Sequence, residues 1–155
     1  MAIVPMFAMA QMKYATVRLQ EVFEKMPETK EANKTLEELA KKYEAENSKL
    51  KTEYEIKYTD YVKSRNNMPQ TIRARREQEL MLISQAIDDF KKVAKKDIEQ
   101  QQEKLLSPVK SKLMKAIKSV GDEVGYAFVI DEAQMLYMGV DFEDITVFVE
   151  AKLGL

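Results

Sequence analysis

Arg65-Asn66-Asn67-Met68-Pro69 lies between two long helical patterns and interrupts them. Adjacent asparagines accept the backbone geometry of a turn, and proline fits the first turn of a new helix. The stretch therefore predicts a short turn near residues 64–70, with a long helix on either side.

The segment before this turn, residues 28–63, contains neither Gly nor Pro. Its apolar and tyrosine side chains recur in steps of three and four, which places them on one face of a helix. Such a helix is about 55 Å long at a rise of 1.5 Å per residue. The stripe contains Leu36, Leu39, Ala40, Tyr43, Leu50, Tyr54, Tyr58 and Tyr61.

The segment after the turn repeats the same pattern. Two stripes of matched length around one turn predict a long antiparallel coiled-coil hairpin over residues 28–108. Asn47 and Gln101 weaken its seams, so we expect a flexible hairpin. Pro108 removes a backbone donor inside a continuing helical pattern and is expected to act as a hinge. The second stripe contains Ile72, Leu80, Ile83, Ile87, Phe90, Ala94, Ile98 and Leu105.

Strand-like segments lie at the two ends of the chain. Residues 13–19 predict a short strand and residues 20–26 a helical turn that ends before Pro27. After Gly121 and Gly125, which are expected to end the second helix, the short apolar runs 126–130 and 135–138 predict a β-hairpin. Asp144 is expected to cap a last helix over residues 145–153.

These elements predict a mainly α fold with a small β base, in which the hairpin is inserted between N- and C-terminal strands. An antiparallel hairpin returns its ends to the same place, so the terminal strands are expected in one sheet. Three short strands bury little apolar surface alone. Residues 11–27 and 109–155 are therefore predicted to form a β-rich oligomerisation body.

The composition argues against several functions. The 25 basic and 26 acidic residues nearly cancel, so no global charge favours nucleic acid. The absence of Cys and His excludes thiol nucleophiles, zinc sites with these ligands and imidazole bases. The four glycines are isolated and no Gly-Lys-Ser/Thr occurs, so no phosphate-binding loop is present. We predict a non-enzymatic protein without cofactor or metal.

The first ten residues form an uncharged apolar run that ends in Ala8-Met9-Ala10. This small-x-small ending is the pattern that signal peptidase accepts, although a basic n-region is missing. We interpret residues 1–10 as the remnant of a signal peptide, with a mature protein that begins at about Gln11. The alternative is an apolar tail on a cytosolic protein.

Two sets of side chains on the hairpin have a functional and a structural interpretation. The basic cluster near the turn would contact anionic lipid, lipopolysaccharide or an acidic client segment, or would only keep the turn soluble. Tyr43, Tyr54, Tyr58 and Tyr61 would bind clients or, as the favoured interpretation, pack in the seam. The basic cluster is Lys63, Arg65, Arg73, Arg75 and Arg76.

Short motifs occur in a specific order and spacing from Lys13 to Leu155. They are Val17-x-x-Gln20-x-Val22-Phe23, Met26-Pro27-Glu28, Ala32-x-x-x-Leu36, Arg73-x-Arg75-Arg76-x-x-Glu79-Leu80, Leu106-x-Pro108-Val109, Val120-Gly121-x-Glu123-x-Gly125-Tyr126, Val129-Ile130-Asp131, Leu136-Tyr137 and Asp144-Ile145-Thr146. Together they resemble the Skp/OmpH family of periplasmic chaperones, in the style of members from Bacteroidetes-like bacteria. Arg18 departs from the pattern, since many relatives carry Asp or Asn there.

The resemblance implies a homotrimer with a β-barrel body and three helical tentacles around a cavity. Such a periplasmic protein would hold unfolded outer-membrane proteins without ATP. Two main alternatives stay open, a structural coiled-coil spacer or adaptor of the cell envelope and a cytosolic prefoldin-like chaperone subunit. A carboxylate-dependent envelope enzyme is a more distant one. The expected trimerisation core contains Val17, Leu19, Phe128, Val129, Ile130, Leu136 and Tyr137.

Overall fold

The computed structural model describes residues 12–155, so the predicted signal-peptide remnant and the mature start at Gln11 lie outside the described residues. Two compact units make up the chain. The central unit is Glu31–Leu105, and the terminal unit combines the residues up to Lys30 with Leu106–Leu155.

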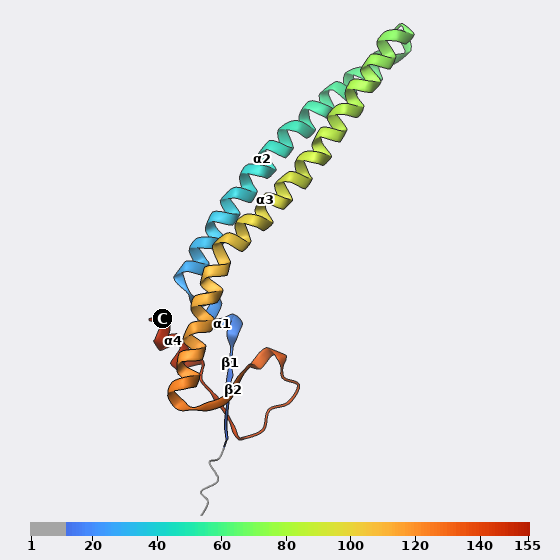
Figure 1. Ribbon diagram of the computed structural model, residues 1–155. Coiled ribbons are helices and arrows are strands. Elements are labelled where there is room, and N and C mark those ends of the chain that lie inside the picture. The colour runs from blue at the N-terminus through green and yellow to red at the C-terminus, as the bar shows by residue number, and fades with distance from the viewer. Residues whose placement is uncertain (1–11) are drawn as a thin grey trace, which may run out of the picture. The chain divides into compact units, whose positions relative to one another are not determined.

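Helices dominate both units (Figure 1). The prediction of a mainly α fold with a small sheet of terminal strands is confirmed. In chain order the elements are β1 (Lys13–Val17), α1 (Leu19–Lys25), α2 (Pro27–Ser64), a 3-10 turn (Arg65–Asn67), α3 (Gln70–Val124), β2 (Tyr126–Asp131), a second 3-10 turn (Glu132–Gln134), β3 (Phe142–Asp144) and α4 (Thr146–Leu153).

In the central unit, α2 and α3 lie side by side and run antiparallel (Figure 1). Their buried and half-buried side chains recur in steps of three and four, as a coiled-coil seam requires. The predicted long antiparallel hairpin is therefore confirmed. On α2 the seam includes Leu36, Leu39, Tyr43, Asn47, Leu50, Tyr54, Lys57 and Tyr61, and on α3 it includes Leu80, Ile83, Ile87, Phe90, Ala94, Ile98, Gln101 and Leu105.

The turn between these helices lies where the sequence predicts it. One 3-10 turn covers Arg65–Asn67, and the Met68 N–H donates to the Arg65 carbonyl at 3.4 Å. Pro69 precedes α3, and its carbonyl accepts a hydrogen bond from the Arg73 N–H at 3.0 Å. Proline fits this position because its missing N–H would have no partner in the first turn of a helix.

In the terminal unit, α3 contains Pro108 and continues to Val124. The helix ends at Gly125, whose φ of 76° is a left-handed conformation that favours glycine. The Gly125 N–H donates to the Gly121 carbonyl at 3.0 Å. Gly121 therefore lies inside the helix, and the prediction that it helps to end the helix is wrong.

The sheet has the strand order β2-β1-β3, and both outer strands pair with β1 in parallel. Ala15 of β1 lies opposite Val129 of β2 and Glu143 of β3. Two strands from the C-terminal part of the chain thus lie on either side of the N-terminal strand. The expectation that terminal strands from both ends share one sheet is confirmed.

The predicted β-hairpin over residues 126–130 and 135–138 is wrong. Residues 135–138 are not a strand, because Glu132–Gln134 form a 3-10 turn and the chain then leads to β3 on the far side of β1. The Asp131 side chain accepts a hydrogen bond from the Ala133 N–H at 3.4 Å and so favours this turn. Parallel strands need a longer connection than a hairpin, and residues 132–141 supply it.

The core of the terminal unit combines β1, α1, α3 and α4. Ala15 and Val17 point from β1 into it, while Ile145 and Val149 pack from the C-terminal end. Burial of a Val or Ile side chain contributes about 1.5–3 kcal/mol. The last helix begins at Thr146 with Ile145 as its N-cap residue, so the predicted cap at Asp144 is one residue too early, although the Asp144 side chain accepts a hydrogen bond from the Thr146 N–H at 2.9 Å. The other buried members are Val22, Met26, Val109, Leu113, Ala116, Ile117 and Val120.

Candidate functional site

Polar bonds cross the seam of the central unit. Tyr43 donates to Asp97 at 2.8 Å, and Lys57 donates to Glu79 at 2.6 Å. Tyr61, nearer the turn, donates to Glu77. Such contacts contribute less than close apolar packing when water can compete for them. The seam near the turn is therefore held more loosely than an apolar coiled coil.

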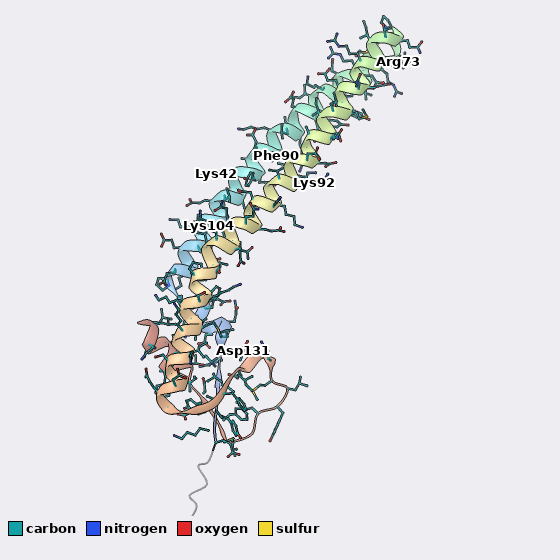
Figure 2. The ribbon with its side chains drawn as sticks, in the orientation of Figure 1. Lys42, Arg73, Phe90, Lys92, Lys104 and Asp131 are labelled. Carbon is teal, nitrogen blue, oxygen red and sulfur yellow. The ribbon has the colours of Figure 1, made fainter. Side chains whose placement is uncertain are left out.

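Tyr43 and Tyr61 confirm the favoured interpretation of the tyrosines. Tyr61 is buried, and the Tyr43 ring meets the ring of Phe90, which Figure 2 labels, edge to face at a centroid distance of 5.9 Å. The hydrogen bond to Asp97 raises the pKa of Tyr43, and that to Glu77 raises the pKa of Tyr61. Both hydroxyls therefore stay protonated donors at neutral pH.

Tyr58 behaves differently. It remains 49% exposed and stacks on Tyr54, with ring centroids 5.9 Å apart and an interplanar angle of 10°. A shallow groove runs along this flank of the seam. Its lining includes Tyr54, Tyr58, Tyr61, Leu80, Met81, Ser84 and Gln85, with Arg65, Glu77, Asp88, Asp89 and Lys92 among the charged residues. We call it the tyrosine groove.

A second groove in the central unit shares no lining residue with the first. Its exposed apolar side chains are Ile72 and Leu82, which are aliphatic. Met81 and Leu82 are neighbours in sequence but point about 100° apart on the helix, so each belongs to a different groove. The second groove, which we call the arginine groove, is lined by Glu53, Lys57, Ile72, Arg75, Arg76, Gln78, Glu79, Leu82 and Ile83.

The predicted basic cluster gathers around the turn. Lys63 lies in the last turn of α2 and Arg65 begins the 3-10 turn, while the three other arginines lie in the first turns of α3, where Figure 2 labels Arg73. Arg76 forms an ion pair with Glu79 at 3.0 Å. Arg73 is half-buried, and its Nε is buried without a hydrogen-bond partner. Lys63, Arg65 and Arg75 are the exposed members without an ion pair among the described residues.

The predicted trimerisation residues divide into two groups. Val17 is buried in the chain's own core, and Leu19 and Val129 pack against that core. Leu136 and Tyr137 are 106% and 85% exposed. They lie in the connection from β2 to β3, so the fold of one chain leaves both side chains largely in solvent.

One face of the sheet carries a cluster of aromatic rings. Tyr14 lies opposite both Phe128 and Phe142 in the parallel register. The ring centroids of Tyr14 and Phe128 are 4.8 Å apart, and those of Tyr14 and Phe142 are 5.6 Å apart. Phe128 stays 46% exposed, and Ile130 on the same face is half-buried. This face is an apolar surface next to the exposed connection.

Over residues 12–155, three or more Asp, Glu, His or Cys side chains nowhere gather as they would around a metal ion. Within the same range, no helix combines the length and the apolar character needed to cross a membrane.

A family model described as outer membrane protein (OmpH-like) matches residues 13–153. The chain belongs to the OmpH-like family. The resemblance that the sequence motifs indicate is thereby confirmed.

This OmpH-like chain is also similar to a crystal structure from Caulobacter crescentus, described as a candidate outer membrane chaperone (OmpH-like) and determined at 2.83 Å resolution. The match has a TM-score of 0.72 and 19% sequence identity, and it covers 99% of this chain and 90% of the other. At this identity the likeness shows the fold. The search of curated proteins found no match.

Several exposed apolar residues of the OmpH-like hairpin escaped the sequence interpretation. The described helices expose Ile56, Met81, Leu82 and Val93 by more than half. These four apolar residues fall between the seam positions of the helical pattern. That departure from the pattern could have identified them as exposed from the sequence. An apolar side chain that lies off the seam of a two-helix hairpin is either exposed to solvent or covered by a binding partner.

Proposed function

We propose that this OmpH-like protein is an ATP-independent holdase of the periplasm that keeps unfolded outer-membrane proteins soluble. The observation that carries the proposal is the set of exposed apolar side chains on the central unit, Ile56, Met81, Leu82 and Val93, in a chain that belongs to the OmpH-like family. The similar Caulobacter protein carries the description of an outer membrane chaperone. Many weak apolar contacts suit a client that has no fixed shape.

Capture in this proposal is passive. The sequence offers no phosphate-binding loop, so no nucleotide cycle would drive release. Several hairpins acting on one client would raise the effective concentration of contacts without demanding any single strong one. The loosely held seam near the turn would allow the hairpins to adapt to clients of different size.

The test is turbidity after dilution of a urea-unfolded β-barrel protein into buffer that contains this protein in molar excess. We expect aggregation to be suppressed equally with and without ATP. A matched amount of an unrelated folded protein is the control. Aggregation at the control rate with several clients would reject the holdase and favour a structural spacer of the envelope.

The oligomeric state forms part of the proposal, with a trimer built on the terminal unit. Leu136 and Tyr137 would lie at its contacts because they are exposed on a chain whose remaining core is complete. Val129 is a poor test residue, since it already packs in that core. Changing Leu136 and Tyr137 together to Asp should yield monomers by light scattering, whereas Met114→Asp, also at an exposed apolar position, should not. A trimeric double variant would overturn this arrangement.

The basic cluster is proposed to contact anionic lipid, lipopolysaccharide or acidic client segments. Lys63, Arg65 and Arg75 are the residues to change, because Arg73 is half-buried and Arg76 is paired with Glu79. Reversing the three charges with Glu should weaken binding to anionic vesicles, and the wild-type binding should decline with salt. If the wild type and the triple variant bound anionic vesicles equally well, the basic cluster would only keep the turn soluble.

Pro108 is proposed to act as a hinge of α3. Its ring removes one backbone donor from the helix, which locally weakens the hydrogen-bond ladder. Pro108→Ala should restore that bond, preserve the oligomer and narrow the range of client sizes that the protein keeps soluble. An unchanged client range would show that Pro108 is only tolerated.

A further inference from the structure

The two flanks of the hairpin differ in chemistry, although each exposes two apolar side chains. The tyrosine groove exposes Tyr58 and Met81 by 49% and 61%, and the arginine groove exposes Ile72 and Leu82 by 48% and 54%. The exposed apolar surface is therefore comparable on the two sides. What differs is the aromatic and thioether character of the first and the cations beside the second.

Tyr58 is placed for contact with another molecule. The seam already uses Tyr54 and Tyr61, while Tyr58 is off the seam and keeps half of its surface open. Stacking on Tyr54 holds its ring parallel to the neighbouring ring and limits its rotation. A rigid aromatic surface binds other rings and apolar side chains with little loss of conformational entropy. Met81 beside it supplies a flexible side chain that adapts to different shapes.

The charges around the tyrosine groove nearly balance. Three acids, Glu77, Asp88 and Asp89, face two bases, Arg65 and Lys92, and Lys92 pairs with Asp89 at 3.1 Å. The charges of the groove therefore favour neither an acidic nor a basic ligand. Ser84 and Gln85 in its lining are exposed and able to exchange hydrogen bonds with polar side chains or backbone.

The spacing of the groove fits an extended chain. Side chains on one face of a helix recur every four residues, which is about 6 Å along the axis. Side chains on one face of an extended chain recur every second residue, which is about 6.6 Å. An extended segment lying along the helix can thus place alternate side chains beside successive turns for two or three contacts.

We propose that the tyrosine groove docks extended segments in which aromatic or large apolar residues alternate with polar ones. Transmembrane strands of outer-membrane barrels have this pattern, with apolar and aromatic side chains on the lipid side and polar ones inward. The inference rests on the proposed function and names the part of the client that this groove recognises. The alternate polar side chains would point away from the groove, and Ser84 and Gln85 would exchange hydrogen bonds with the backbone of the docked segment.

The experiment compares two double variants of the full chain. The first combines Tyr58→Ser and Met81→Ser. The second, the matched control, combines Ile72→Ser and Leu82→Ser. Fluorescence anisotropy measures binding of a labelled short peptide with alternating aromatic and polar residues. A second peptide has the same composition with its aromatic residues contiguous. We expect the first variant to lose about fivefold or more in affinity for the alternating peptide, and the control to lose less than about twofold.

The wild-type protein should also prefer the alternating peptide to the contiguous one. Equal losses in the two variants, or equal binding of the two peptides, would overturn the inference. Circular dichroism and light scattering on each variant establish that fold and oligomeric state are retained. Loss of helicity in the first variant would move the test to Tyr58→Leu, which removes the ring and keeps apolar volume.

The turbidity assay separates this inference from the holdase proposal. Suppression of aggregation by the wild type, with undiminished suppression by the Tyr58 and Met81 variant, rejects the groove and retains the holdase. Failure of the wild type to suppress aggregation rejects the holdase itself.

Discussion

The terminal and central units are built from the same residue types but are held together differently. In the terminal unit, side chains from four elements enclose a core whose central members, Val22, Met26, Ile145 and Val149, have no exposed surface. In the central unit two helices share one seam, and contacts such as Tyr43 with Asp97 and Lys57 with Glu79 stand where apolar pairs could pack. A two-helix seam leaves most of each helix in water, whereas a core of four elements excludes it.

The difference implies a division of labour. A closed apolar core favours one defined structure, and local opening there costs a large part of the total free energy of unfolding. A polar seam opens locally at lower cost. These properties agree with the roles proposed above, assembly for the terminal unit and client contact for the central unit.

The largest expected effect comes from emptying the core of the terminal unit. Met26→Ala removes a side chain with 0% exposure and should lower the free energy of unfolding by about 3 kcal/mol. Leu39→Ala, at a half-buried seam position, should cost about 1 kcal/mol because less surface is lost. Urea unfolding followed by circular dichroism measures both. Equal losses at the two sites would remove the contrast between the units.

A smaller effect of opposite sign is expected at Asn47. This side chain is 7% exposed in the seam, and its Oδ1 is buried without a hydrogen-bond partner. Asn47→Leu should stabilise the central unit by about 1 kcal/mol, since an unsatisfied acceptor is replaced by an apolar side chain. Hydrogen exchange should slow over residues 31–105 and not in the terminal unit. If exchange slowed equally in both units, or slowed in neither, the seam would not be what limits local opening of the central unit.

The smallest expected effect is a pH dependence of the seam. The hydrogen bond from Lys57 and then that from Arg76 hold the pKa of the Glu79 carboxyl below its usual value. The folded seam therefore binds fewer protons at this carboxyl than the unfolded chain does. Its contribution is complete above the usual pKa of about 4.3 and is lost as the pH falls through the lowered value.

Spin labels placed across α2 and α3 near the turn would measure this opening. We expect the distance between the helices to broaden on acidification, and the broadening to be absent in Glu79→Gln, which carries no titrating carboxyl. The terminal unit also contains acids with lowered pKa values, such as Glu28 beside Lys112 and Glu123 beside Lys152. Its apolar core should nevertheless keep it folded, so simultaneous opening of both units would contradict the contrast.

The hairpin was predictable because helical periodicity is a local property. The steps of three and four around residues 65–69 place the seam without any knowledge of distant contacts. The same pattern could not separate Tyr58 from Tyr61, since both belong to an apparent stripe. Their exposures of 49% and 9% depend on where the partner helix lies.

The strands were less predictable than the hairpin, because their pairing depends on distant contacts. Residues 126–130 were recognisable as a strand from composition, but their neighbour in the sheet was not. The run 135–138 has the same β-forming character and nevertheless forms part of a connection, with Leu136 and Tyr137 in solvent. A local pattern records a preference for extended backbone and carries no information about which strand will supply the hydrogen bonds.

By itself, the sequence determined the two long helices, the turn between them, the terminal position of the strands and the OmpH-like motifs. Only the tertiary structure decided the parallel order β2-β1-β3, the burial of Val17 against the exposure of Leu136, and the assignment of Tyr58 and Leu82 to different grooves. The physical reason is the range of the interactions. Helix formation and turn geometry depend on residues a few positions apart, whereas strand pairing and burial depend on contacts between segments more than a hundred residues apart, as between Ala15 and Val129.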